Sequence, residues 1–113
     1  MPQPPTAARL RSLPVETVQG RAVPVAVGLR SRLLGLAGLR RDAVGPGLFI
    51  PRCSSVHTFG MRFALDIAFL DGRGEVLSTR RAVGPRRLAF HRGAAAVLEI
   101  PAGQGGDFAP PAD

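Results

Sequence analysis

The sequence predicts a mostly β domain, α+β by strict count, in the form of a small antiparallel barrel or a strongly bent sheet of about five to six short strands with one short helix. Three observations support this class. Apolar residues alternate with other residues at positions 22–27 and again at 64–70, as in half-buried strands. The turn-forming run Asp71-Gly72-Arg73-Gly74 separates two such segments. Glycine and proline, 14 and 11 of the 113 residues, divide the chain into short pieces, which favours turns and hairpins.

The chain length fits one domain, which we place at residues 14–107, with flexible tails at residues 1–13 and 108–113. One cysteine excludes an internal disulfide framework and a cysteine-rich zinc module. No run approaches the roughly 20 apolar residues of a membrane helix, and the N-terminal residues lack the apolar core of a secretory signal. We therefore expect a cytoplasmic protein that makes no contact with a membrane.

The formal net charge of +7 raises the question of an anionic partner. All fifteen basic residues are arginine, and they form two loose clusters, at residues 30–41 and 80–92. Neither cluster is interleaved with the aromatic residues that a platform for single-stranded nucleic acid requires. We therefore do not expect nucleic-acid binding, and keep a basic adaptor for an anionic partner as a second alternative, recognisable by steep salt dependence.

The first strands are expected between Val15 and Val27. Residues 22–27 alternate, and residues 14–19 are the plausible antiparallel partner. Pro24 cannot donate to a ladder, so it places this strand at an edge or at a bulge.

One helix is predicted from Gly28 to Gly38, which would end it in a left-handed conformation. Leu29, Leu33 and Leu36 fall at helical spacing, and we expect this stripe to dock on the sheet. Gly35, inside the helix, costs about 1 kcal/mol relative to alanine, which indicates that something packs closely against it.

Further strands are predicted at residues 48–50, 64–70, 75–80 and 94–100, and residues 64–80 should form an antiparallel hairpin. In its first arm, residues 65, 67 and 69 would share one face and residues 66, 68 and 70 the other. Residues 81–93 are expected to be basic and irregular, and residues 53–60 to form a loop.

The segment of residues 53–71, which we expect to be central to the fold, begins with the only cysteine of the chain. Cys53, His57 and Asp66 have the residue types of a thiol nucleophile with its base and orienting carboxylate. With His91 or Glu99 the same residues would make a zinc site. The plainer interpretation is a packed thiol and a histidine bonded to loop backbone. We predict that the chain holds no metal or cofactor, and that none of these residues is catalytic.

Asp66 and Glu99 each stand inside an apolar strand, where an ionised carboxylate needs hydrogen bonds or a cation. For Asp66 we expect a latch to the loop of residues 54–60, with presentation to a small ligand as the alternative. The two carboxylates could also form an acid/base pair.

Three stretches resemble the family called domain of unknown function 192: residues 32–36, residues 53–71 and residues 97–103. The resemblance covers residues 21–107, and its most specific part is His57-Thr58-Phe59-x-Met61-Arg62-Phe63-x-x-Asp66. It implies a compact, largely β fold with one short helix and no established activity, cofactor or catalytic residue. The aspartate matches both branches of the family and His57 only one, which speaks against a shared chemistry on His57. The structural motif comprises Arg32, Gly35, Asp66, Glu99 and Gly103.

We conclude from the sequence that the protein is a monomeric binding module for an unknown small molecule or protein. The alternative is a hydrolase-like or metal-assisted enzyme using Cys53, His57 and Asp66. The candidate ligand groove is lined by Cys53, His57, Thr58, Met61, Arg62 and Asp66.

Overall fold

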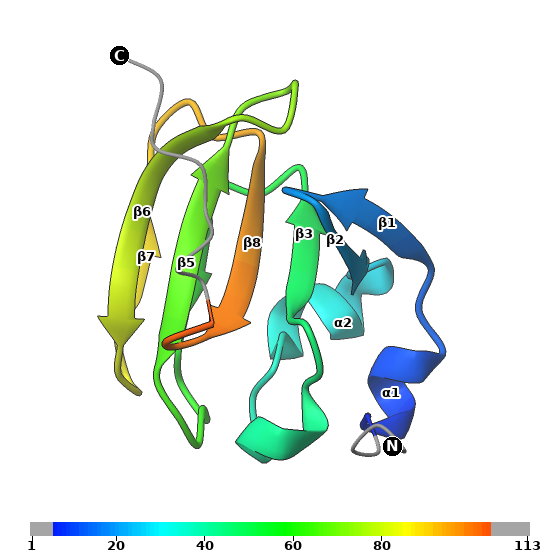
Figure 1. Ribbon diagram of the computed structural model, residues 1–113. Helices are drawn as coiled ribbons and strands as arrows, with labels where there is room; N and C mark the ends of the chain where they lie inside the picture. The colour runs from blue at the N-terminus through cyan, green and yellow to red at the C-terminus, as the bar shows by residue number, and fades with distance from the viewer. Residues whose placement is uncertain (1–5, 105–113) are drawn as a thin grey trace.

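The computed structural model describes residues 6–104. Within this range the chain forms eight strands in three antiparallel sheets, two α-helices and one short 3-10 helix (Figure 1). The elements are α1 (Ala8–Arg11), β1 (Val15–Val18), β2 (Arg21–Pro24), α2 (Gly28–Leu34), the 3-10 helix (Arg41–Ala43), β3 (Leu48–Pro51), β4 (Ser55–His57), β5 (Leu65–Leu70), β6 (Val76–Val83), β7 (Leu88–Phe90) and β8 (Ala96–Pro101). None of the helices in the described range is long and apolar enough to cross a membrane.

A four-stranded sheet with the order β3-β8-β5-β6 forms the centre of the fold (Figure 1). Every residue of β5 and β8 is buried, because apolar layers cover both faces of these two strands. As predicted, Leu65, Ile67 and Phe69 belong to one apolar layer, and Ala68 and Leu70 to the other. Alternation in the sequence therefore separated the two faces correctly.

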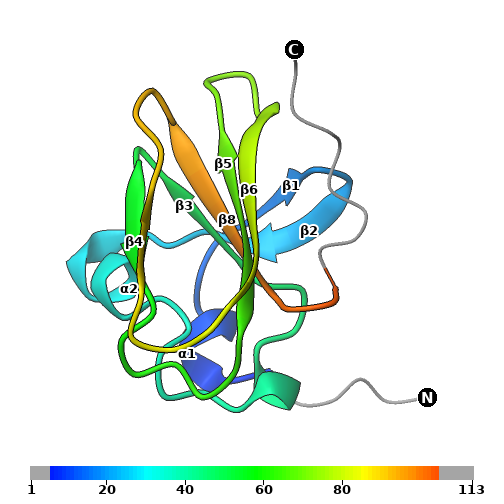
Figure 2. The same cartoon turned by 90° about the vertical axis from the view of Figure 1, so that its left-hand side faces the viewer.

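The two faces of this sheet are covered by different parts of the chain (Figure 2). The hairpin β1–β2 packs on one face through Val18 and Val23. On the other face, the core includes Leu10 of α1, Leu36 after α2 and Ala89 of β7. The groove described below lies on this second side.

Both predicted hairpins are confirmed. Strand β1 pairs with β2, and β5 pairs with β6 on either side of the turn at residues 71–75. The turn is ordered by Asp71, whose Oδ1 accepts hydrogen bonds from the backbone N–H groups of Arg73 at 2.8 Å and Glu75 at 3.0 Å. Such side-chain acceptance is the usual reason for aspartate at the start of a turn.

The predicted number of strands was too low, and the described residues contain no closed barrel. Strands β4 and β7 pair only with each other, in segments expected to be a loop and an irregular stretch. Each is three residues long, which is too short for a period-two pattern to be recognised.

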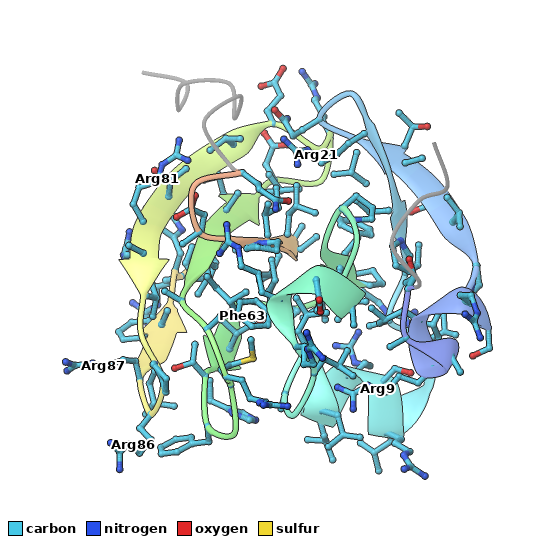
Figure 3. The ribbon with its side chains drawn as sticks, turned by 60° about the horizontal axis from the view of Figure 1, so that its bottom comes forward. Arg9, Arg21, Phe63, Arg81, Arg86 and Arg87 are labelled. Atoms are coloured by element: carbon cyan, nitrogen blue, oxygen red, sulfur yellow. The ribbon has the colours of Figure 1, made fainter. Side chains whose placement is uncertain are left out.

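The prediction of a flexible tail at residues 1–13 is wrong for residues 6–13, because these residues pack on the domain. Leu10 is buried in the core, and the N–H of Ala7 donates to the carbonyl of Ala43 at 2.8 Å. Arg9 donates to the carbonyls of Gly35 at 3.0 Å and Ala37 at 2.6 Å (Figure 3). A single helical turn has no periodicity that the sequence could show. The C-terminal tail at residues 108–113 lies outside the described residues.

Helix α2 differs from the prediction in its end and in its contacts. It stops at Leu34, because Gly35 adopts φ 52° and ψ −125°, outside the helical region. Leu29 and Leu33 are 74% and 59% exposed, and only Leu36, beyond the helix, is buried. The expectation that this leucine stripe docks on the sheet was therefore wrong.

Candidate ligand groove

A groove with a volume of about 450 Å³ separates α2 from the ribbon formed by β4 and β7. Its walls are largely apolar: Leu33 and Leu34 from the helix side, Val56 from β4, and Leu88 and Phe90 from β7. Leu88 and Phe90 are 76% and 70% exposed, so the groove is open to solvent along one wall.

Glu99 is one of the residues that line the groove. In the register of β5 and β8, Glu99 lies opposite Ile67, so its side chain is on the face that carries the groove. The residue is only 3% exposed, and Oε1 is buried without a hydrogen-bond partner. Burial raises the pKa of this carboxyl to about 7.

Gly35 packs directly against this carboxyl. A Cβ at Gly35 would lie 3.1 Å from Oε1 of Glu99, closer than most Cβ contacts. The backbone conformation, with φ 52°, is also one that residues with a Cβ rarely adopt. The close packing expected at this glycine is therefore confirmed, and its neighbour is the buried carboxyl.

We expect Gly35→Ala to lower the free energy of unfolding by about 1–2 kcal/mol, because it combines backbone strain with this close contact. Chemical denaturation would measure it. Gly72→Ala is the matched control, since Gly72 has no positive φ and a Cβ there would meet nothing within 4 Å. Equal stability of the two variants would contradict the account of Gly35.

Arg32 fixes one end of the groove. Its guanidinium donates to the carbonyl of Arg52 at 2.8 Å and also to the carbonyl of Pro51. These bonds tie α2 to the end of β3 and to Arg52, the residue that follows it. The cation is thus engaged by backbone rather than by Glu99.

Asp66 does not belong to the groove. It lies opposite Ile100 in the β5–β8 register, on the face opposite to that of Glu99. Its Oδ1 accepts from the N–H of Ala82 at 2.8 Å, and its Oδ2 from the N–H of Gly103 at 3.1 Å and from Arg81 at 3.4 Å. An acid/base pair of Asp66 and Glu99 is excluded, because the sheet separates the two side chains.

A latch role for Asp66 is therefore supported, but not with the predicted partner. Instead of the loop at residues 54–60, Asp66 holds a bulge in β6 and Gly103, the second residue after the end of β8. The bulge arises because Leu65 pairs with Val83 and Ile67 with Arg80, which leaves two residues of β6 opposite one of β5.

The other predicted groove residues separate into two groups. His57 and Met61 line the groove, whereas Cys53, Thr58 and Arg62 do not. Thr58 is a buried structural residue, whose hydroxyl donates to the carbonyl of Gly84 at 2.7 Å and accepts from the N–H of Arg87 at 2.8 Å.

Cys53, His57 and Asp66 do not form a catalytic arrangement. The thiol of Cys53 contacts the carbonyl of Ser55 at 3.1 Å, and Nδ1 of His57 accepts from the N–H of Phe59 at 3.2 Å. The oxygens of Asp66 are bonded on the other side of the sheet. Within residues 6–104, no group of three or more His, Cys, Asp and Glu side chains could hold a metal ion.

Sequence reasoning missed the apolar walls of the groove and the position of Glu99 between them. The sequence does contain a feature that marks each of them. Leu88 and Phe90 interrupt a basic segment, and Glu99 was recognised as a carboxylate within a strand. Two arginines of that segment, Arg86 and Arg87, point away from the fold (Figure 3).

The fold and the groove define a small β-rich domain with an open, largely apolar groove that has one buried acid, Glu99, in its lining. The chain belongs to the DUF192 family, described as an uncharacterized ACR, whose model matches residues 14–108. No curated protein matches the chain.

Two solved structures have a similar fold. One is a candidate transcription regulator from Sinorhizobium meliloti, with a TM-score of 0.66 and 22% identity, over 85% of this chain and 84% of that one. The other is a protein of unknown function from Novosphingobium aromaticivorans, with a TM-score of 0.60 and 22% identity, over 80% of this chain and 72% of that one. At this identity the likeness shows the fold alone.

Proposed function

We propose that the protein binds a small, largely apolar ligand in the groove between α2 and β7, as a binding module rather than an enzyme. The supporting observation is the groove itself. Its volume lies within the range of roughly 300–1,000 Å³ that is typical of small-molecule sites, which combine apolar walls with few polar groups. Glu99 is such a polar group, and its carboxyl oxygen has no partner in the protein.

The exposed apolar side chains support the same proposal. Leu33, Leu88 and Phe90 line the groove, and each is more than half exposed. Single exposed apolar residues are ordinary, whereas a contiguous set around a concavity is characteristic of binding sites. A ligand in the groove would remove this surface from water.

The polar groups of the groove lack the contacts of a catalytic machinery. Ser55, His57 and Glu99 all line it, but no hydrogen bond joins any two of them. A serine nucleophile would need a base within hydrogen-bond reach. This arrangement favours ligand binding over hydrolysis.

We expect the uncharged fluorescent probe phenylnaphthylamine to bind saturably, and the double variant Leu88→Ser/Phe90→Ser to bind it at least about tenfold more weakly. The expectation follows from the burial free energy of a large apolar side chain, roughly 1.5–3 kcal/mol. Fluorescence titration measures both affinities.

Val15→Ser is the control for this titration. Val15 is also exposed and apolar, but it lies in β1, on the opposite side of the sheet from the groove. If the double variant bound the probe as tightly as Val15→Ser and the parent protein, the proposal would be wrong.

A further inference from the structure

We infer that the groove selects ligands that carry a protonated amine at one end of an apolar body, with the ammonium group paired to the carboxylate of Glu99. This inference rests on the proposed function, because it names the ligand chemistry of the same groove. It is drawn from the buried, unpaired carboxyl of Glu99 and from the hydrogen bonds that Arg32 and His57 already make within the protein.

The Glu99 carboxyl has a buried oxygen, Oε1, that lacks a hydrogen-bond partner. Buried polar side-chain atoms are hydrogen-bonded in the large majority of cases, so an orphaned one indicates an absent partner. No hydrogen bond or ion pair of residues 6–104 reaches the Glu99 carboxyl, and Oε1 is fully buried. Gly35 is the residue that packs beside Oε1, and having no side chain it offers Oε1 no hydrogen-bond donor of its own.

The apolar surroundings of Glu99 favour a partner with a positive charge. The neighbours of Glu99 in the groove from β3 and β7 include the apolar Ile50 and Ala89, and its pair in β5 is Ile67. In such surroundings an isolated carboxylate is costly, and a cation that also donates hydrogen bonds compensates it best. An ammonium group supplies both the charge and up to three donors.

The protein's own cations do not fill this role. Arg32 from α2 and His57 from β4 are the other ionisable side chains that line the groove. The guanidinium of Arg32 is bonded to the carbonyls of Pro51 and Arg52, and Nδ1 of His57 accepts from Phe59. A ligand amine would therefore meet a carboxyl that no protein cation neutralises.

The inference also sets a direction for the dependence on pH. Burial raises the pKa of Glu99 to about 7 in the free protein, so the acid is largely protonated at pH 6 and largely ionised at pH 8. Pairing with an ammonium group requires the ionised form. The affinity for an alkylamine should therefore rise from about pH 6 to about pH 8, while the affinity for an alcohol of the same chain length stays nearly constant.

The test is displacement of bound phenylnaphthylamine by octylamine, octanol and octanoate, three ligands with the same chain length. At about pH 8 we expect octylamine to bind at least about tenfold more tightly than octanol, as a charged hydrogen bond predicts. The net charge of +7 acts against a cation at long range, so this preference would report on Glu99 itself.

Glu99→Gln should abolish the preference for octylamine over octanol, measured as the ratio of the two affinities in the same variant. The inference is overturned if octylamine binds no more tightly than octanol, if octanoate binds best, or if Glu99→Gln retains the preference. These results leave the proposed function standing as long as the probe still binds in the groove. Absence of saturable probe binding to the parent protein would instead overturn the proposed function, and the inference with it.

Discussion

Asp66→Ala is expected to lower the free energy of unfolding by about 2–4 kcal/mol. The carboxylate accepts from the backbone N–H groups of Ala82 and Gly103, and its side chain is almost completely buried. A hydrogen bond to a charged group contributes roughly 1.5–3 kcal/mol, and the substitution removes two of them. Ala82 and Gly103 are exposed residues, so water replaces part of this contribution. The ion pair with Arg81 adds less, because that guanidinium is half-exposed.

The bulge in β6 increases this expected loss. Ala82 adopts φ 53°, a left-handed conformation that is uncommon for a residue with a Cβ. Asp66 accepts from the N–H of that same residue, so it stabilises the conformation that the bulge requires. Without the carboxylate, we expect the end of β6 to loosen together with the turn at Gly103 that follows β8.

Urea denaturation of Asp66→Ala, beside the parent protein, would measure the effect. Asp42→Ala is the matched control, since Asp42 is exposed and its ion pair with Arg40 lies at the surface. We expect this control to change stability by no more than about 0.5 kcal/mol. A variant at Asp66 as stable as the control would contradict the latch.

The hairpins and the two faces of β5 could be predicted because their determinants are local. Alternation assigns side chains to faces, and a run such as residues 71–74 specifies its own turn. The role of Asp66 as a buried acceptor followed from its place in an apolar strand. Its partners, Ala82 and Gly103, could not be predicted, because they are brought to it by strand pairing over long sequence separations.

The groove shows the limit of the same reasoning on helices. Periodicity placed Leu29 and Leu33 on one side of α2, but it contains no information on what that side contacts. The helix ends at Leu34, and the ribbon β4–β7 stands apart from it. Leu33 therefore lines the groove and Leu29 stays exposed, instead of both docking on the sheet. Glu99 was assigned to a structural motif for the same reason. Its strand could be predicted from the sequence, but the groove that Glu99 lines could not.

Glu99→Gln is expected to stabilise the unliganded protein above neutral pH by about 3 kcal/mol, with little effect near pH 5. The pKa of Glu99 is about 7 in the folded protein and 4.5 in the ordinary, solvated state. Between these values the folded state binds more protons than the unfolded state, so stability falls as the pH rises. The loss begins near the lower pKa and is complete above the higher one, and a difference of this size corresponds to roughly 3 kcal/mol.

Glutamine has nearly the same shape as the protonated acid and does not ionise, so its variant should lack this decline. Denaturation of both proteins at intervals from about pH 5 to about pH 8 would give the difference curve directly. Glu75→Gln, at an exposed position in the turn before β6, is the control and should follow the parent protein at every pH. Parallel curves for the parent and Glu99→Gln would mean that Glu99 is solvated or paired in solution. That result would contradict the description of Glu99 as a buried acid without a partner.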